Sequence, residues 1–226
     1  MIPLNTIQCR DCKEGMREIP DKSIDLVITD PPYGINAASA QFTRQGKQTG
    51  QSKCVSGTSY TPSEWDKMPP TKEYFDEIFR ISKNQIIFGG QHFIESLSSH
   101  SCWLVWDKDN GENLYADAEL AWTSFDSAVR VFKWKWHGML QEDMAHKEER
   151  VHPTQKPVKL FEWIIKNYAK EGDTICDPFL GSGTTMIACE NLGRKCRGCE
   201  IDPGYVAVEL QRYKDTFPDK EIKLIS

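Results

Sequence analysis

The sequence lacks any apolar run approaching the roughly 20 residues that a membrane-spanning helix needs. Its opening stretch, MIPLNTIQCRD, also lacks the positively charged segment followed by an apolar segment that marks a secretory signal peptide. These two absences argue against a membrane or secreted protein, and we expect a cytoplasmic one.

An excess of positive charge is also missing. The chain has 28 Lys and Arg against 33 Asp and Glu, so its formal net charge is −5 at pH 7. Such a balance excludes a general attraction to nucleic acid. Any polyanionic partner must therefore meet a local basic surface.

The eight cysteines do not indicate a disulfide framework, because such frameworks belong to small secreted chains. Cys9 and Cys12, like Cys196 and Cys199, have the C-x-x-C spacing found in zinc sites. Both pairs lie in strand-like sequence, TIQCRDC and RKCRGCEID, where residues three apart point to opposite faces. We therefore predict buried thiols and no metal, with a zinc site as the alternative.

Strand-like and helix-like segments alternate along the 226 residues, a length that is ordinary for one α/β domain. IDLVIT and QIIF are apolar on both faces, as in a parallel sheet covered by helices on each side. The candidate strands are 6–9, 24–30, 85–90, 102–108, 118–125, 129–135, 173–177 and 195–201, and the candidate helices are 74–82, 157–170, 184–193 and 205–213. The alternation predicts a doubly wound, mostly parallel α/β fold in which ligands bind at the carboxyl ends of the strands.

A glycine-rich loop, DPFLGSGTT at 177–185, follows the strand DTIC and opens a helix. Gly181 and Gly183 let the backbone approach a ligand. No lysine follows, which excludes a P-loop, and Met186 stands where a dinucleotide fingerprint has its third glycine. Glu200 ends the next strand, about 20 residues on, where an acidic residue binds ribose hydroxyls. The pattern indicates a nucleoside cofactor without a pyrophosphate, such as S-adenosylmethionine; the alternative is a tight turn with no ligand.

The strand IDLVIT ends abruptly at DPPYG, because Pro31 and Pro32 suit neither a helix nor a sheet. An exocyclic amine of adenine or cytosine is a poor nucleophile, since its lone pair is delocalised into the ring. A carboxylate at Asp30 and the rigidly held carbonyl of Pro31 can accept both N–H groups and turn the lone pair outward. Tyr33 can stack on the base. A plain strand-ending turn would explain the prolines but not the acid and the aromatic ring.

With these motifs together, the chain resembles the small, phage-type members of the amino-methylating DNA methyltransferases, the N6-adenine/N4-cytosine group. The residues that carry the resemblance are TDPPYG (29–34), WDK (106–108), ADAELAWT (116–123), HPTQKP (152–157), DPFLGSGTT (177–185) and GCEIDPGY (198–205). The resemblance implies a Rossmann-like fold of the S-adenosylmethionine-dependent methyltransferase type over residues 1–226, in a bacterium or a phage-infected host cell. It also implies a circularly permuted, β-type motif order, because DPPY precedes the glycine loop.

The resemblance further implies a set of cofactor-binding residues. Asp11 resembles the acid that contacts the adenine of the methyl donor, although Arg10 stands where the family usually has glycine. Thr154 and Lys156 would close over the methionine end; a polar entry to the helix at Pro157 is the alternative. The predicted set is Asp11, Thr154, Lys156, Asp177, Phe179, Gly181, Ser182, Gly183, Thr184, Thr185, Glu200 and Asp202.

The choice of base depends on Asp30. By resemblance, DPPY is associated mainly with adenine N6 and SPPY mainly with cytosine N4. We predict that the enzyme methylates the N6 amine of adenine in DNA after the base has flipped out of the helix. The alternatives are a cytosine N4-methyltransferase, an RNA or protein-glutamine methyltransferase, and a nucleotide- or DNA-binding module with an inactive site.

One candidate for DNA contact is the segment 31–63, which contains no Asp or Glu. It carries Arg44, Lys47 and Lys53 among small polar residues, and we predict a mobile loop at about 35–63 that becomes ordered on DNA. A surface loop without DNA contacts is the alternative.

The other candidate is KWKWHG, 133–138. On a strand, Lys133 and Lys135 share one face, and the two tryptophans share the other. The alternative is a lysine-fringed strand whose tryptophans enter the core. Residues 126–151 leave little room for a recognition region, so either recognition is short or a homodimer supplies a second subunit.

Overall fold

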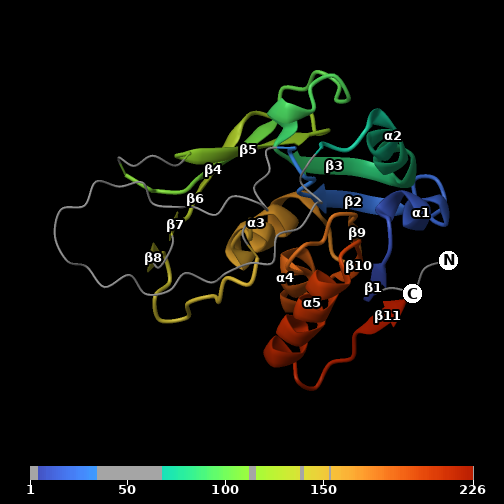
Figure 1. Cartoon of the computed structure of the whole chain (residues 1–226). Coiled ribbons are helices and arrows are strands. Elements are labelled where there is room, and N and C mark those ends of the chain that lie inside the picture. Colours follow the sequence, from blue (N-terminus) through green and yellow to red (C-terminus); the bar gives the residue numbers. More distant parts are fainter. Residues whose placement is uncertain (1–4, 35–67, 112–115, 138–139, 153, 226) are drawn as a thin grey trace.

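The computed structural model describes residues 5–34, 68–111, 116–137, 140–152 and 154–225. Within these ranges, nine strands form one sheet in the order β11-β1-β10-β9-β2-β3-β5-β4-β6 (Figure 1). The strands are β1 (Thr6–Cys9), β2 (Ile24–Thr29), β3 (Ser82–Phe88), β4 (Trp103–Asp107), β5 (Ala118–Thr123), β6 (Arg130–Lys133), β9 (Thr174–Asp177), β10 (Lys195–Glu200) and β11 (Lys223–Ile225). A separate antiparallel pair consists of β7 (Trp136–His137) and β8 (Leu140–Gln141). The helices are α1 (Cys12–Arg17), α2 (Lys72–Ile81), α3 (Val158–Tyr168), α4 (Thr184–Asn191) and α5 (Pro203–Thr216), with a short 3-10 turn, η1 (Gly90–His92).

The sheet is mostly parallel. All neighbouring strands from β11 to β3 pair in parallel, whereas β5 is antiparallel to both β3 and β4. The doubly wound α/β fold predicted from the sequence is confirmed, with β5 making the sheet a mixed one.

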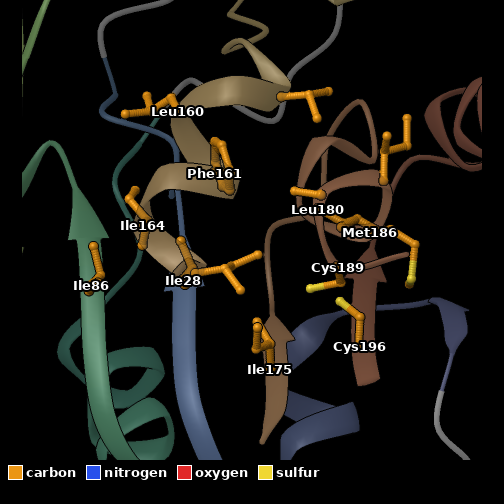
Figure 2. Packing of buried hydrophobic residues seen from close by; sticks show 14 of the residues in the cluster. Ile28, Ile86, Leu160, Phe161, Ile164, Ile175, Leu180, Met186, Cys189 and Cys196 are labelled. Carbon is orange, nitrogen blue, oxygen red and sulfur yellow. The ribbon is translucent and has the colours of Figure 1, made fainter. Parts of the chain in front are cut away.

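Helices cover both faces of the sheet, because the central strands are apolar on both sides. On β2, Val27 packs with α1 and α2, while Ile28 faces the opposite way, toward α3 and α4. Figure 2 shows this second layer, where Phe161 and Ile164 of α3 lie over Ile28 and Ile86. The apolar residues of α3 recur at three- and four-residue spacing, which gives the helix one buried stripe.

The chain order changes direction between β9 and β2, which are parallel neighbours in the middle of the sheet. From β2 the chain proceeds to β3 on one side, and from β9 it proceeds to β10 on the other. Such a switch point leaves a crevice at the carboxyl ends of the strands. The segments that follow β2 and β9 are DPPYG and the glycine loop, so the fold brings the two motifs to one edge.

The strand context predicted for the cysteine pairs is confirmed for one pair and wrong for Cys12 of the other. Cys196 and Cys199 lie on β10 and enter the two opposite cores, as the strand context predicts. Cys12 is not in a strand: it begins α1, because the Asp11 carboxylate caps that helix and accepts the N–H of Lys13 at 2.8 Å. No group of three His, Cys, Asp or Glu within the described ranges is arranged to hold a metal ion.

None of the helices in the described ranges is long and apolar enough to cross a membrane. The predicted mobile loop at about 35–63 lies outside the described residues.

Candidate active site

A cavity of about 350 Å³ opens at the carboxyl ends of β2, β9 and β10. It is lined from one side by Asp30 and Pro32 of DPPYG and from the other by the glycine loop. Ten of the predicted cofactor residues line it: Asp11, Thr154, Lys156, Asp177, Phe179, Gly181, Ser182, Thr184, Thr185 and Glu200. The two motifs therefore share one site, as the strand-end argument predicts.

Asp177 fixes the start of the glycine loop. Its Oδ1 accepts hydrogen bonds from Thr29 Oγ1 at 2.7 Å and from the Phe179 N–H at 3.1 Å, and its Oδ2 accepts one from Thr185 Oγ1 at 2.5 Å. Burial raises the pKa of Asp177 to about 6, although these three donors act in the opposite direction. Because Thr29 ends β2, this carboxyl joins the strand of DPPYG to the loop.

The loop itself depends on left-handed backbone. Gly181 has φ +59° and Gly183 has φ +76°, and Gly183 is the N-cap of α4. A side chain at Gly181 would meet no atom within 4 Å, so the backbone there faces open space on the cavity side.

Glu200 connects the loop to the end of β10. Its Oε2 accepts the Gly181 N–H at 3.0 Å and its Oε1 accepts the Asp202 N–H at 2.8 Å. Burial raises the pKa of Glu200 to about 7, with the two backbone donors opposing the shift. The carboxyl therefore titrates near neutral pH at the cavity wall.

Two predicted cofactor residues do not line the cavity. Asp202 is the N-cap of α5, where its carboxylate accepts the N–H groups of Gly204 at 2.7 Å and Tyr205 at 3.4 Å. Gly183 supplies the turn into α4. Both shape the elements around the cavity from behind its wall.

Asp30 has both carboxylate oxygens engaged. Tyr33 donates its hydroxyl to Oδ1 at 2.5 Å, and Lys156 forms an ion pair with Oδ2. Burial raises the pKa of Asp30; Lys156 lowers it by less, and the nearby negative charge of Glu119 adds to the increase.

Tyr33 lies in an aromatic cluster instead of standing alone. Its ring is stacked on the exposed ring of His92, with centroids 4.8 Å apart and an angle of 17° between the planes. Phe93 contacts it edge-on at 6.0 Å. One face of the ring that we predict to stack on a base is thus already in contact with His92.

Tyr74, His152 and Tyr205 line the cavity but are not among the predicted site residues, although His152 opens HPTQKP and Tyr205 ends GCEIDPGY. Tyr74 donates its hydroxyl to Asp11 Oδ2 at 2.7 Å. The available signal is its position on α2, outside the apolar stripe of Phe75, Ile78 and Ile81.

Arg212 on α5 is also absent from the sequence prediction. It donates to the Ser182 carbonyl at 2.8 Å and to Thr184 Oγ1 at 3.0 Å, and it pairs with Glu148 at 3.0 Å. This mostly buried guanidinium therefore holds the glycine loop through two of its residues. No local pattern marks it, because the contact joins residues 30 positions apart.

Of the five predicted DNA-contact residues, the structure describes two, Lys133 and Lys135. The predicted strand at 129–135 is shorter in the structure, where β6 ends at Lys133 and does not include Lys135. Both lysines pair with Asp109, at 2.8 and 3.1 Å. Trp136 is buried and donates its N–H to the Gln155 carbonyl at 2.9 Å, and Trp134 packs against the core, which agrees with the core alternative for the two rings. Arg44, Lys47 and Lys53 lie outside the described residues.

Comparisons with known proteins agree with this geometry. The family model described as DNA methylase, of the N6/N4 type, matches residues 75–211. The chain is 28% identical to the type II methyltransferase M.HinfI of Haemophilus influenzae, over 99% of this chain and 72% of that protein. Its fold is similar to that of TTHA0409, a putative DNA modification methylase of Thermus thermophilus solved with S-adenosyl-L-methionine (TM-score 0.61, 18% identity, covering 98% of this chain and 100% of that one). It is also similar to that of the cytosine-N4-specific PvuII DNA methyltransferase (TM-score 0.60, 16% identity, covering 94% and 87%).

Proposed function

The chain belongs to the N6/N4 family of DNA methylases, and on this premise we propose that it transfers a methyl group to the N6 amine of adenine in DNA. The observation that carries the proposal is the shared cavity: the carboxylate of DPPYG and the glycine loop line the same space. An amine held at Asp30 would therefore lie beside a molecule bound at the loop.

The methyl donor is S-adenosyl-L-methionine, and the cavity fits it chemically. Glu200 offers a carboxylate for ribose hydroxyls, and Asp11 offers one for the adenine moiety. The glycine loop, Thr154 and Lys156 would hold the methionine end. When bound, the donor supplies an electrophilic methyl group.

The amine is activated by the chain's own acceptors. We propose that the Asp30 carboxylate accepts one N–H group of the target amine and that the carbonyl of the buried Pro31 accepts the other. Accepting both makes the nitrogen more tetrahedral and directs its lone pair at the methyl group. A carboxylate also stabilises the positive charge that develops on the nitrogen as the N–C bond forms and the bond between the methyl group and the donor sulfur breaks. The methylated nitrogen then loses one proton to water.

Adenine is favoured over cytosine by Asp30, since DPPY resembles the adenine-specific tetrad. The fold supports both choices, because the PvuII protein with the same fold is cytosine-N4-specific. Cytosine N4 therefore stays the second candidate. In either case the base must leave the duplex to reach a carboxylate at the cavity wall, at a cost of a few kcal/mol.

The test is to incubate the protein with tritiated methyl donor and with mixed-sequence DNA or RNA, digest to nucleosides and identify the labelled base. We expect the label on N6-methyladenine from DNA. A label on N4-methylcytosine would overturn the choice of base, and a label confined to RNA would overturn the substrate.

A further inference from the structure

Four charged side chains of alternating sign lead from Asp30 of DPPY to the start of β5 and the end of β4. Lys156 contacts Asp30 Oδ2 and, at 3.1 Å, Glu119 Oε2, and Glu119 pairs through its other oxygen with Lys108. We name this series, Lys108–Glu119–Lys156–Asp30, the charge chain. Lys156 is the most buried of the four, with a side chain that is 5% exposed.

The outer half of the charge chain comes from two motifs that the proposed function leaves without a role. Lys108 ends WDK, and Glu119 lies in ADAELAWT. Antiparallel pairing of β4 with β5 places Glu119 opposite Trp106, and the Lys108 N–H donates to the Asp117 carbonyl at 2.9 Å. The sheet therefore fixes the positions of Lys108 and Glu119 relative to the DPPY motif.

The surroundings make Lys156 a cation that needs a counter-charge. Its Nζ lies 4.9 Å from the centre of the Phe88 ring, which excludes water from that side. Burial by itself would lower the pKa of Lys156, but Asp30 and Glu119 outweigh it and raise the pKa. Burial by itself would raise the pKa of the partly buried Glu119, but Lys156 and Lys108 outweigh it and lower that pKa.

We propose that Glu119 is a positioning residue that holds the Lys156 ammonium between two carboxylates and so leaves Asp30 negative toward the incoming amine. With Asp30 as its only partner, Lys156 would neutralise that carboxylate. The field that stabilises positive charge on the amine nitrogen would then be lost. Lys108 opposes this effect of Glu119, because it attracts the Glu119 carboxylate and so weakens the hold of Glu119 on Lys156.

This inference rests on the proposed role of Asp30, and it makes a prediction that a merely structural role does not. Glu119→Gln removes a negative charge and leaves Lys156 entirely to Asp30, so the pKa of Asp30 falls. Lys108→Met frees Glu119 to attract Lys156, so the pKa of Asp30 rises. Tyr33 and Asp177, the other titratable groups near Asp30, are unchanged in both variants.

The measurement is a carbon-13 NMR titration of aspartate-labelled protein without DNA, with the Asp30 signal assigned by its loss in Asp30→Asn. We expect Glu119→Gln to lower the pKa of Asp30 by about one unit and Lys108→Met to raise it. Glu119→Asp, which keeps the charge, should return it toward the wild-type value. Glu119→Gln should also slow single-turnover methyl transfer about tenfold, with donor affinity kept.

Shifts of the same sign in Glu119→Gln and Lys108→Met, or no shift in either, would overturn the proposal. So would an unchanged transfer rate in Glu119→Gln. Failure of the proposed function is seen separately, as an absence of N6-methyladenine from DNA treated with the wild type, whatever the titrations show. Failure of the role of Asp30 is seen as methyl transfer by Asp30→Asn at the wild-type rate.

Discussion

Both oxygens of the Asp30 carboxylate accept hydrogen bonds from the chain, from Tyr33 and from Lys156. Each carboxylate oxygen has two lone pairs, so one acceptor site on each oxygen is left for an amine. The existing donors fix the orientation of the carboxylate before a base arrives. Asp30 is thus held in place and still able to bind the target.

We expect Asp30→Ala to lower the rate of methyl transfer by on the order of a thousandfold, because the main acceptor for the amine is lost. Donor binding should survive, since Lys156 keeps Glu119 as a partner and the glycine loop is untouched. Single-turnover transfer and calorimetric titration with the donor measure the two effects.

The matched control is Asp25→Asn. Asp25 lies on β2 and does not line the cavity, and its carboxylate pairs with Lys83 at 2.7 Å. This variant should transfer methyl groups at the wild-type rate. Loss of donor binding in Asp30→Ala would mean that Asp30 belongs to the cofactor pocket and not to the amine site.

We expect Glu200 to make donor binding dependent on pH. Its pKa is raised to about 7 by burial, so the carboxyl is mostly protonated at pH 6 and mostly ionised at pH 8. An ionised carboxylate is the better acceptor for ribose hydroxyls, and the donor should therefore bind up to about tenfold more weakly at pH 6 than at pH 8. Glu200→Gln should bind weakly with little dependence on pH, and a flat wild-type profile would refute this role.

Among the elements, α5 contains a carboxyl that lowers stability. Glu209 is 2% exposed, and neither of its carboxyl oxygens has a hydrogen-bond partner among the described residues. Burial raises its pKa well above the usual value, and the charges of Glu200 and Asp177 add to the shift. The native state therefore holds this proton more tightly than the unfolded chain does.

The sign of the effect follows by linkage. Stability from the Glu209 proton is fully present below the unfolded pKa, near 4.5, and is lost as the pH rises toward the higher native pKa. Glu209→Gln should therefore raise the free energy of unfolding at pH 8 by at least about 1 kcal/mol and leave it nearly unchanged at pH 4.5. Urea titrations at the two pH values provide the comparison, and a constant difference between the proteins would contradict it.

The elements differ in how far the sequence predicts them. The predicted strand TIQC coincides with β1, and the predicted strand at 24–30 gives β2, whose residues IDLVIT are mostly apolar. The helix α1 has six residues, and β7, β8 and β11 have two or three, which is too short for a period to be recognised. The sequence also does not predict that β5 would reverse direction within the sheet.

The residues of the site also differ in how far the sequence predicts them. Asp30 and the glycine loop are predictable, because each motif follows a strand directly and strand ends meet at one edge. Glu119 and Arg212 are not, since antiparallel pairing and helix packing bring them to the site from distant positions in the chain. Glu119 lies in the motif ADAELAWT, but the contacts of both residues depend on the tertiary fold.

Considered as one molecule, the protein must bind a polyanion despite a net charge of −5. Lys133 and Lys135 are partly neutralised by Asp109, which reduces what they can offer to phosphates. DNA contact by Arg44, Lys47 and Lys53 and the presence of a second subunit both stay predictions from the sequence. The fold is shared with a cytosine-N4-specific protein, so the overall architecture does not select the base.

The most direct test is mass spectrometry of the nucleosides from DNA treated with methyl donor and either the wild-type protein or Asp30→Ala. An amine site built on Asp30 predicts N6-methyladenine with the wild type and none above background with the variant. N4-methylcytosine in place of N6-methyladenine, or equal amounts of N6-methyladenine from both proteins, would contradict it.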